Sequence, residues 1–200
     1  MSVTGFSDRE PVRVGASVSD MMAGMYAANG MQAALIAREK DPERLGRYVD
    51  ISMLDASVSV MGLPLAQYHV TGKVPDRIGN EHPSAAPFDA FVCGDGEYVV
   101  VAISNDAAFA GFATAIGKPM LSDNPDYRRN ADRKANYAQL KPILDEAFLQ
   151  RSRDEWLAFF EQNGVPCGSV DTVADVAASE QVGLQLTSSV CAAIGNPMLI

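Results

Sequence analysis

The feature that most constrains this chain of 200 residues is a run of small and apolar residues between Val14 and Arg38. Because these side chains have so little bulk, another backbone can approach closely. We therefore expect a helix over Met21–Arg38 with a face suited to tight burial against other elements. The small residues in it are Ala23, Gly24, Ala27, Ala28, Gly30, Ala33 and Ala34.

A single acidic residue, Asp20, stands where a short polar turn enters this helix. Ser17 and Ser19 are residue types preferred at helix N-caps, and a carboxylate there can accept hydrogen bonds from unpaired N–H groups. The positive end of the helix dipole also favours a carboxylate. From these residues alone, Asp20 is expected to be an N-cap worth about 1 kcal/mol. A role as nucleophile or acid/base is the alternative.

Composition restricts the class of protein and its partners. A hydrophobic fraction of 48% suits a globular chain of one or two small domains. A net charge of −9 argues against nucleic acid and anionic membranes as partners, because both need a basic face. No apolar run reaches the roughly 18 residues of a membrane span. No signal region follows Met1, so we expect a cytoplasmic location.

The three cysteines, Cys93, Cys167 and Cys191, are odd in number and lack metal-ligand spacing. Neither a disulfide framework nor a metal site is expected. We interpret all three as reduced and structural.

The first half of the chain after Arg38 alternates between regular and irregular stretches. Lys40–Leu45 is a charged turn, and Arg47–Ser52 alternates in the manner of a strand. Met53–Tyr68 predicts an apolar helix, buried on most faces, that Gly62 and Pro64 kink or end.

The stretch His69–Pro87 has no periodicity and is rich in Gly and Pro, so it predicts a long loop. Arg77, Glu81 and His82 supply its polar chemistry. Long loops in compact chains often act as lids or binding segments. The residues leave open whether this loop is such a segment or a solvated linker between two domains.

The second half carries clearer signals. Phe88–Cys93 and Tyr98–Ile103 predict a β-hairpin around Gly94–Glu97. Helices are expected over Ala107–Ile116, Asn136–Leu149, Ser152–Gln162 and Thr172–Ser179, with a polar connector at Ser122–Arg133 and a short extended stretch at Val165–Val170. In the third helix Trp156, Leu157 and Phe160 share one stripe, so Trp156 is expected in the core rather than at a ligand.

Six segments in this order resemble the class III CoA-transferase family, which includes formyl-CoA and carnitine-CoA transferases and 2-methylacyl-CoA racemase. They are MSVTGFSDREPVRVGASVSDMMAG, AALIAR, LGRYVDISMLDA, IGNEHPSAAPF, DGEYVVVAISNDAAF and NGVPCGSV. One departure is local: the chain reads KDPERLGRY where the family usually has a Thr-Gly-Arg-Gly-Gln type of turn.

The resemblance implies that Asp20 is the catalytic nucleophile and replaces the N-cap interpretation. The carboxylate would attack an acyl-CoA thioester, form a mixed anhydride and then an aspartyl-CoA thioester, and pass CoA to a small carboxylic acid. Coenzyme A and acyl-CoA would be substrates, with no permanently bound cofactor. The family position of Gly79, Asn80, Glu81 and His82 implies a lid beside the active site.

An acyl-CoA racemase of the same family is the alternative activity. Racemases resemble transferases around the aspartate but need a second acid/base pair, including a Glu just after the hairpin. This chain has Ser104, Asn105 and Asp106 there, which resembles the transferase pattern because Asn cannot shuttle protons as Glu does.

Family members run to about twice this length, and the resemblance implies that a Rossmann-like N-terminal region lies upstream. The expected fold is α/β: residues 1–70 hold the Asp20 helix and a linker, 71–180 a small α/β domain with the hairpin, and 181–200 a truncated return segment. Full-length relatives form interlocked dimers, so we expect a homodimer or a complement to an N-terminal half. A non-catalytic remnant or assembly subunit is the second hypothesis.

Overall fold

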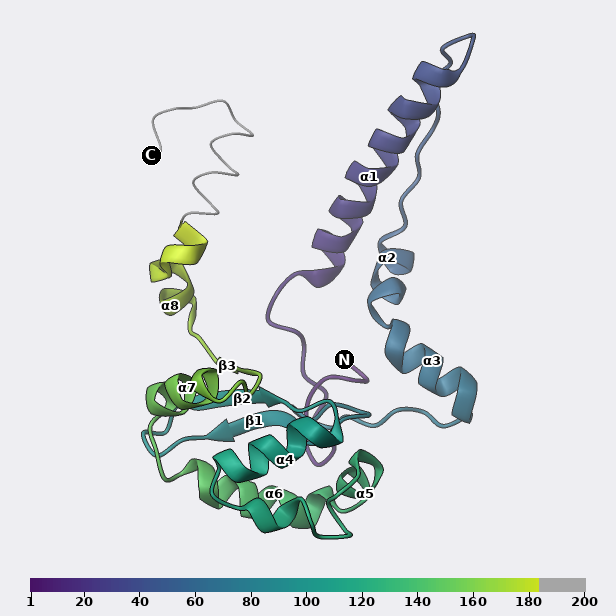
Figure 1. Cartoon of the computed structure of the whole chain (residues 1–200). Helices are drawn as coiled ribbons and strands as arrows, with labels where there is room; N and C mark the ends of the chain where they lie inside the picture. Colours follow the sequence, from purple (N-terminus) through teal and green to yellow (C-terminus); the bar gives the residue numbers. More distant parts are fainter. Residues whose placement is uncertain (184–200) are drawn as a thin grey trace. The chain divides into compact units, whose positions relative to one another are not determined.

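The computed structural model describes residues 1–183, in two compact units that meet in the sequence between Gly79 and Asn80 (Figure 1). The chain is mixed α/β and mostly helical, as the sequence predicted, with one small antiparallel sheet among the described residues. Each unit is described by itself. The predicted return segment 181–200 lies almost entirely outside the described residues.

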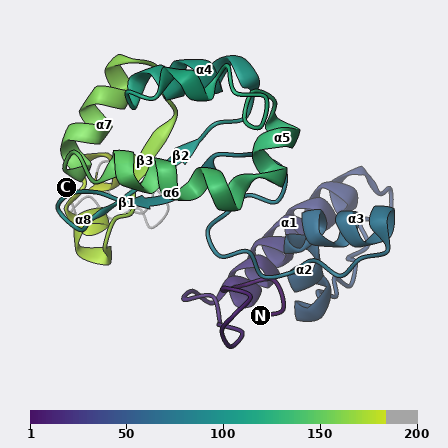
Figure 2. The same cartoon turned by 90° about the horizontal axis from the view of Figure 1, so that it is seen from below.

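Three helices make up the first unit: α1 (Val18–Lys40), α2 (Met53–Val60) and α3 (Gly62–Thr71). α1 and α2 pack side by side (Figure 2). The helix predicted over Met53–Tyr68 breaks at Met61, next to Gly62 and Pro64, as expected from those residues. Pro64 is tolerated in the first turn of α3 because no N–H is needed there. Gly72 ends α3 with φ of 68°, a conformation that favours glycine.

The prediction of a strand over Arg47–Ser52 is wrong for the described residues. The chain forms no ladder there and packs against α1 instead. The contact is close, since a Cβ on Gly30 would stand 2.8 Å from Val49 Cγ1. A strand needs a neighbour with free backbone groups, and the N–H and C=O groups of α1 are already paired within the helix. Gly30 thus allows the close approach expected of this helix, although its neighbour is the Val49 side chain and not another backbone.

The predicted tight burial of the apolar helices is not found within this unit. α1 and α3 have no buried residue, and α2 buries only Ala56. An all-round apolar helix needs neighbours on several sides, whereas α1 packs on one side against α2 and the segment before it. The large apolar side chains left exposed include Met21, Met25, Met31, Leu35, Ile36, Met53, Leu54, Val60 and Leu63.

The first 17 residues form a loop that is fastened to residues 77–79. Phe6 makes an isolated β-bridge with Ile78, and the Gly79 N–H donates to the Gly5 carbonyl at 2.9 Å. The Arg77 guanidinium donates to the carbonyls of Phe6 and Arg9 at 3.2 and 2.7 Å. These contacts close the first unit at its C-terminal end.

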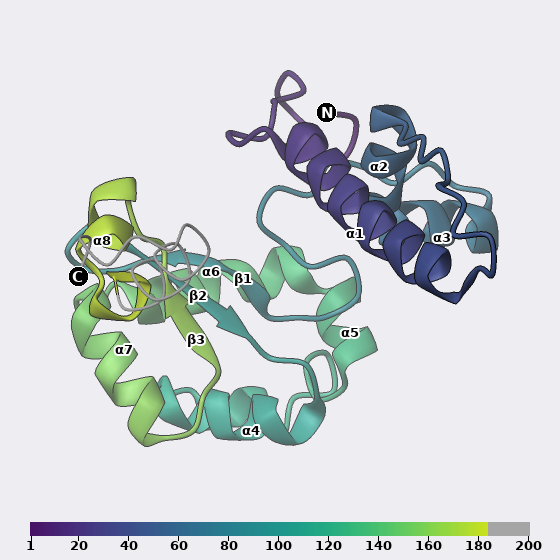
Figure 3. The ribbon, with the colours of Figure 1, turned by 90° about the horizontal axis from the view of Figure 1, so that it is seen from above.

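The second unit is built on a three-stranded antiparallel sheet in the order β1 (Phe88–Val92), β2 (Tyr98–Ala102) and β3 (Cys167–Ser169). β1 and β2 form the predicted hairpin, with Phe88 opposite Ala102 and Val92 opposite Tyr98. Gly96, at φ of 85°, makes its turn. The helices of this unit are α4 (Asp106–Ala115), η1 (Pro119–Leu121), α5 (Asn130–Ala135), α6 (Tyr137–Phe148), α7 (Arg153–Gln162) and α8 (Val173–Ala178). Figure 3 shows α4, α6 and α7 beside the sheet.

Four of these helices match the predicted ones to within a residue or two, and β3 lies in the predicted extended stretch. The short helix α5 is a correction, since its residues fall mostly in the stretch predicted as a polar connector. Its formation depends on tertiary contacts of Asn130 and Arg133, which the local sequence does not reveal.

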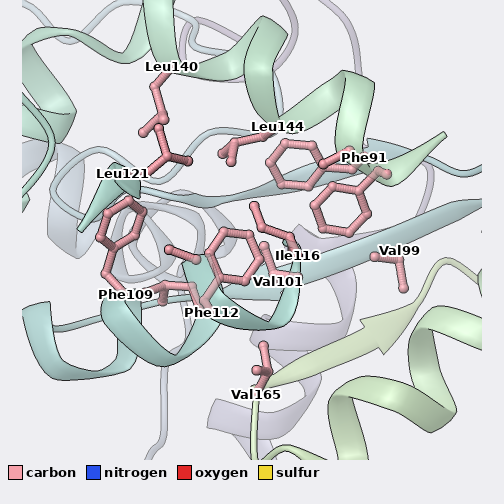
Figure 4. Packing of buried hydrophobic residues seen from close by; sticks show 14 of the residues in the cluster. Phe91, Val99, Val101, Phe109, Phe112, Ile116, Leu121, Leu140, Leu144 and Val165 are labelled. Atoms are coloured by element: carbon pink, nitrogen blue, oxygen red, sulfur yellow. The ribbon is translucent and has the colours of Figure 1, made fainter. Parts of the chain in front are cut away.

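Aromatic and aliphatic side chains from β1, β2, α4 and α6 converge on one core (Figure 4). Phe91 stacks on Phe148 with ring centroids 4.4 Å apart. Trp156 is buried, as predicted, and its Nε1–H donates to the Phe148 carbonyl at 2.8 Å. The second unit therefore has a hydrophobic core of its own.

Candidate active site

Asp20 lies in the first turn of α1, three residues after the N-cap Ser17. Its side chain is exposed, and the nearest hydrogen-bond donor to it is the Ser19 hydroxyl, at 3.4 Å from Oδ2. Ser17 makes no side-chain capping bond. In the described part of the chain Asp20 forms no ion pair, so its carboxylate is free to meet a ligand from solvent.

The backbone around Asp20 offers donors for negative charge. The amides of Ser19 and Asp20 belong to the first turn, where no helical acceptor exists, and neither forms a hydrogen bond within residues 1–183. The 23 residues of α1 align their peptide dipoles behind these amides. Such an end of a helix attracts anions and can hold a developing oxyanion.

A pocket of about 230 Å³ lies in the same unit, and the sequence analysis did not identify it. Tyr26 of α1, residues 50–52 and Asp55 with Ala56 of α2 line it, whereas Asp20 does not. The Tyr26 hydroxyl donates to Ser59 Oγ at 3.0 Å, and the Ser52 hydroxyl accepts from the Asp55 N–H. The first of these bonds joins α1 to α2, and the second caps the start of α2. The signal available in the sequence was Ser52 three residues before Asp55, a helix-start pattern.

The predicted lid residues divide between the two units. Gly79 belongs to the first, where Phe6 packs so closely that a Cβ on Gly79 would lie 2.4 Å from a ring carbon. Its φ of 65° also favours glycine. Asn80, Glu81 and His82 belong to the second unit, and Asn80 is exposed.

Glu81 and His82 both contact the body of the second unit. Glu81 accepts from Lys134 Nζ at 2.8 Å. The His82 ring stacks on Phe88 with centroids 4.9 Å apart, and the His82 N–H donates to the Phe88 carbonyl. His82 Nδ1 accepts from the Ser84 N–H at 3.2 Å, which leaves Nε2 as the ring donor.

The residues after the hairpin have structural contacts. Asn105 caps α4, with its side-chain oxygen accepting from the Ala108 N–H at 2.8 Å. Asp106 Oδ1 accepts from the Asn130 N–H at 2.8 Å and from Arg133 Nη2 at 2.9 Å. Because this carboxylate oxygen already holds two donors, it is poorly placed to move a proton on a substrate.

The buried titratable groups of the second unit also have structural partners. Burial raises the pKa of the Asp89 carboxyl, although the Ala90 N–H and the Tyr137 hydroxyl both donate to it. Burial raises the pKa of the Cys93 thiol to about 11, and burial likewise raises the pKa of Cys167. Both thiols are therefore protonated near neutral pH and are poor nucleophiles. Cys191 lies outside the described residues.

Among residues 1–183, no group of three or more His, Cys, Asp or Glu side chains could hold a metal ion. No helix within these residues combines the length and hydropathy needed to cross a bilayer.

Comparison with known proteins places this geometry in context. The sequence model of CoA-transferase family III matches residues 1–189. The chain is 36% identical to the acetyl-CoA:oxalate CoA-transferase of Acetobacter aceti, over 100% of this chain and 52% of that enzyme. It is 34% identical to the succinyl-CoA:glutarate CoA-transferase of Homo sapiens, over 91% of this chain and 41% of that enzyme.

Solved structures agree with the sequence comparisons. A CAIB/BAIF family protein from Brucella suis has a TM-score of 0.76 and 35% identity, over 92% of this chain and 48% of that one. Rv3272 from Mycobacterium tuberculosis, at 22% identity and a TM-score of 0.75, shares the fold over 88% of this chain and 45% of its own. The chain thus spans about half the length of the relatives that it matches.

Proposed function

The chain belongs to CoA-transferase family III, and on that premise we propose that it takes part in moving CoA from an acyl-CoA thioester to a carboxylic acid, with Asp20 as the nucleophile. The observation that carries the proposal is an exposed carboxylate in the first turn of a long helix, beside two backbone amides without acceptors. Because the chain spans about half of its relatives, the complete site includes groups beyond those described here.

The chemistry begins with attack of an Asp20 carboxylate oxygen on the thioester carbonyl, which forms a C–O bond and expels CoA as a thiolate. The thiolate then attacks the Asp20 carbonyl of the mixed anhydride, releases the donor acid and leaves an aspartyl-CoA thioester. The acceptor carboxylate then attacks the aspartyl-CoA thioester and expels the CoA thiolate, which gives a second mixed anhydride. The thiolate attacks the acceptor carbonyl of this anhydride and releases the Asp20 carboxylate. Covalent catalysis of this kind divides one difficult exchange into easier steps.

The first turn of α1 suits both charged stages of this cycle. The positive end of the helix dipole attracts anions to this turn. Each attack on a carbonyl creates an oxyanion, and a free amide such as that of Ser19 can donate to it. Gly24, one turn after Asp20, has nothing within 4 Å of where a Cβ would stand, which leaves space for a substrate chain.

The acceptor to test first is a small dicarboxylic acid. Oxalate, glutarate and mesaconate appear in the names of relatives that are 30 to 36% identical to this chain. A second carboxylate on such an acceptor stays charged after the first has reacted, so it can anchor the molecule electrostatically.

Covalent trapping tests the role of Asp20. The chain is incubated with acetyl-CoA or succinyl-CoA, alone and together with the part of a full-length relative that it does not span, and then treated with hydroxylamine or borohydride. We expect the modification on Asp20, with no label and no transfer in Asp20→Asn. The Asn variant should fold normally, because Asn also suits a helix start.

Asp55 provides a matched control, since it is also exposed and in the first turn of a helix. The label should persist in Asp55→Asn. Labelling of another carboxylate, or full turnover in Asp20→Asn, would show that the nucleophile lies elsewhere.

The same premise extends to the segment Gly79–Ser84, which we propose closes over bound acyl-CoA and shields the anhydride from water. Glu81→Ala and His82→Ala should then raise thioester hydrolysis relative to transfer. If both variants leave transfer and hydrolysis unchanged in the complemented protein, this segment is not a lid.

Racemisation is the less favoured activity. The two residues after Ser104 cap α4 and bind Asn130 and Arg133, so they contribute to the fold rather than a free acid/base pair. Measuring exchange of the α-proton of a 2-methylacyl-CoA with deuterium distinguishes the two activities, because CoA transfer itself requires no exchange at that carbon.

A further inference from the structure

The segment between residue 80 and β1 is fastened to α5 at several points. The Asn130 side chain bridges two of its residues: Oδ1 accepts from the Ala86 N–H at 3.0 Å, and Nδ2 donates to the Ser84 carbonyl at 2.8 Å. Arg133 Nε donates to the Ala86 carbonyl at 2.6 Å. One side of a six-residue helix therefore holds the C-terminal end of the segment.

This end of the segment is firmly fixed. Arg133 is fully buried, and it also donates to the Tyr127 and Arg128 carbonyls at 2.9 and 3.0 Å and to Asp106. Its guanidinium lies 4.2 Å from the Phe109 ring centroid. Removing any of these partners would leave a buried polar group unpaired, which is unfavourable.

Glu81 is held differently, by one contact that can open. Its carboxylate pairs with Lys134 Nζ at 2.8 Å, and the two side chains are 36% and 26% exposed. Because both side chains are partly exposed, water can replace this single ion pair more readily than the fully buried contacts of Arg133. Residues 130, 133 and 134 are spaced i, i+3 and i+4, which places both kinds of contact on one side of α5.

The pair also sets the charge that this segment presents. While Lys134 pairs with Glu81, the lysine compensates the negative charge of the carboxylate. Once the pair opens, that negative charge is uncompensated. Acyl-CoA and a carboxylate acceptor are both anions, so a free Glu81 would repel them. The protein has a net charge of −9 and therefore little spare positive charge to offset that repulsion.

We propose that Lys134 is a positioning residue for the lid: it docks and neutralises Glu81, while Asn130 and Arg133 form the fixed end about which the segment moves. This proposal rests on the proposed function, because it takes residues 79–84 as the segment that covers an anionic substrate. Lys134 acts through Glu81 and touches no substrate itself.

Amide hydrogen exchange on the chain itself tests the docking. In Lys134→Ala the backbone amide of His82, which donates to the Phe88 carbonyl at 3.0 Å, should exchange about threefold faster, while the amide of Ala86, which donates to Asn130 Oδ1, stays unchanged. Lys134→Arg should restore slow exchange, as should the charge-swapped pair Glu81→Lys with Lys134→Glu. Lys118→Ala, which removes a lysine paired with Glu146 elsewhere in the unit, is the control.

Asn130→Ala should give the opposite pattern, with faster exchange at Ser84 and Ala86. Two results would overturn the docking proposal: exchange in Lys134→Ala that equals Lys118→Ala, or acceleration that spreads equally over residues 80–86. The first would mean that the ion pair has no effect, and the second that Lys134 has a general structural role.

Kinetics in the complemented protein test the electrostatic consequence. Lys134→Ala should raise KM for acyl-CoA severalfold with little change in kcat, and added salt should reduce the difference because it screens the charges. An unchanged KM, with exchange as expected, would reject the substrate-positioning role. The exchange result does not depend on Asp20, so a failure of the proposed nucleophile is recognised separately by the absence of the covalent label.

Discussion

The two units of the chain differ in how much of their own apolar surface they bury. The second unit encloses a cluster of 20 buried hydrophobic residues, which extends from Ala86 to Val165. In the first unit Ala56 is the sole buried hydrophobic residue among those described, although α1 to α3 are rich in Met, Leu and Val. The same kind of side chain thus stabilises one unit from within and leaves the other with surface to be covered by further protein.

The comparison implies different sources of stability. Burial of apolar area contributes about 25 cal/mol per Å², and the second unit obtains that contribution from contacts within itself. For the first unit, we propose that association of the chain with a second copy or with the rest of a full-length protein supplies it. Large exposed apolar patches on a protein commonly mark such interfaces.

The largest expected effect is loss of a core aromatic ring. Phe148 is fully buried and stacked on Phe91, so Phe148→Ala should lower the free energy of unfolding of the second unit by about 3–5 kcal/mol. Leu54→Ala, at a residue that is 73% exposed, should change the free energy of unfolding of the first unit by less than about 0.5 kcal/mol. Urea unfolding followed by the fluorescence of the single Trp, Trp156, measures the first change, and circular dichroism of the helices measures the second. Equal effects would refute the proposed difference between the units.

The next effect concerns association through the first unit. Met21 and Met25 are both exposed on α1, and a methionine buried in an interface contributes about 1.5–3 kcal/mol. Replacing both by Glu should therefore shift the chain from oligomer to monomer in light scattering at micromolar concentration. Met120→Glu, at an exposed methionine of the second unit, is the control. A wild-type chain that is monodisperse and monomeric would contradict the prediction.

A smaller effect, about 1 kcal/mol, is expected from removing helix caps. Ser152 forms a capping box with Glu155 at the start of α7, and Ser52 accepts from the Asp55 N–H at the start of α2. Ser152→Ala should lower the stability reported by Trp156 fluorescence, whereas Ser52→Ala should leave that signal unchanged and reduce helicity measured by circular dichroism. If Ser52→Ala shifts the fluorescence transition equally, the units do not unfold independently.

The smallest effect is a pH dependence within the second unit. Burial raises the pKa of Asp89 above its ordinary value of 3.8, so its folded form holds a proton more tightly than its unfolded form. The contribution of Asp89 to stability is therefore complete below pH 3.8 and is lost as pH rises through the raised pKa. Asp89→Asn removes this dependence.

The difference between the wild-type and Asp89→Asn pH profiles of the urea midpoint should consequently slope downward as pH rises above 3.8. Subtracting the two profiles cancels the carboxylates whose pKa is lowered, such as Asp95 and Glu155. A flat difference across this range would show that Asp89 is not perturbed by its burial.

Much of the second unit was predictable because its signals are local. Apolar alternation around Gly94–Glu97 predicted the hairpin, and the stripe containing Trp156 and Phe160 predicted a buried helix face. The break between α2 and α3 followed from Gly62 and Pro64. At the candidate site, Asp20 and the segment containing Glu81 were identified by resemblance to a family, and their roles stay predictions.

Other features depend on contacts between residues far apart in the chain. Arg47–Ser52 alternates like a strand but forms none, because the part of α1 that it contacts, around Gly30, has its backbone groups paired within the helix. Arg133 lies in a polar stretch that predicts exposure, yet its side chain is fully buried. Its guanidinium donates to carbonyls of residues 5 to 47 positions away in the chain.

By itself, then, the sequence determined where helices and turns begin and end and which family the chain resembles, because caps, glycines and periodic apolar residues act over a few neighbouring positions. The tertiary structure alone decided which of the apolar helices are covered, where Arg133 finds its acceptors, and that Lys134 meets Glu81. Those outcomes depend on which partners the fold brings within reach, and a hydrogen bond or an ion pair forms only over a few ångströms.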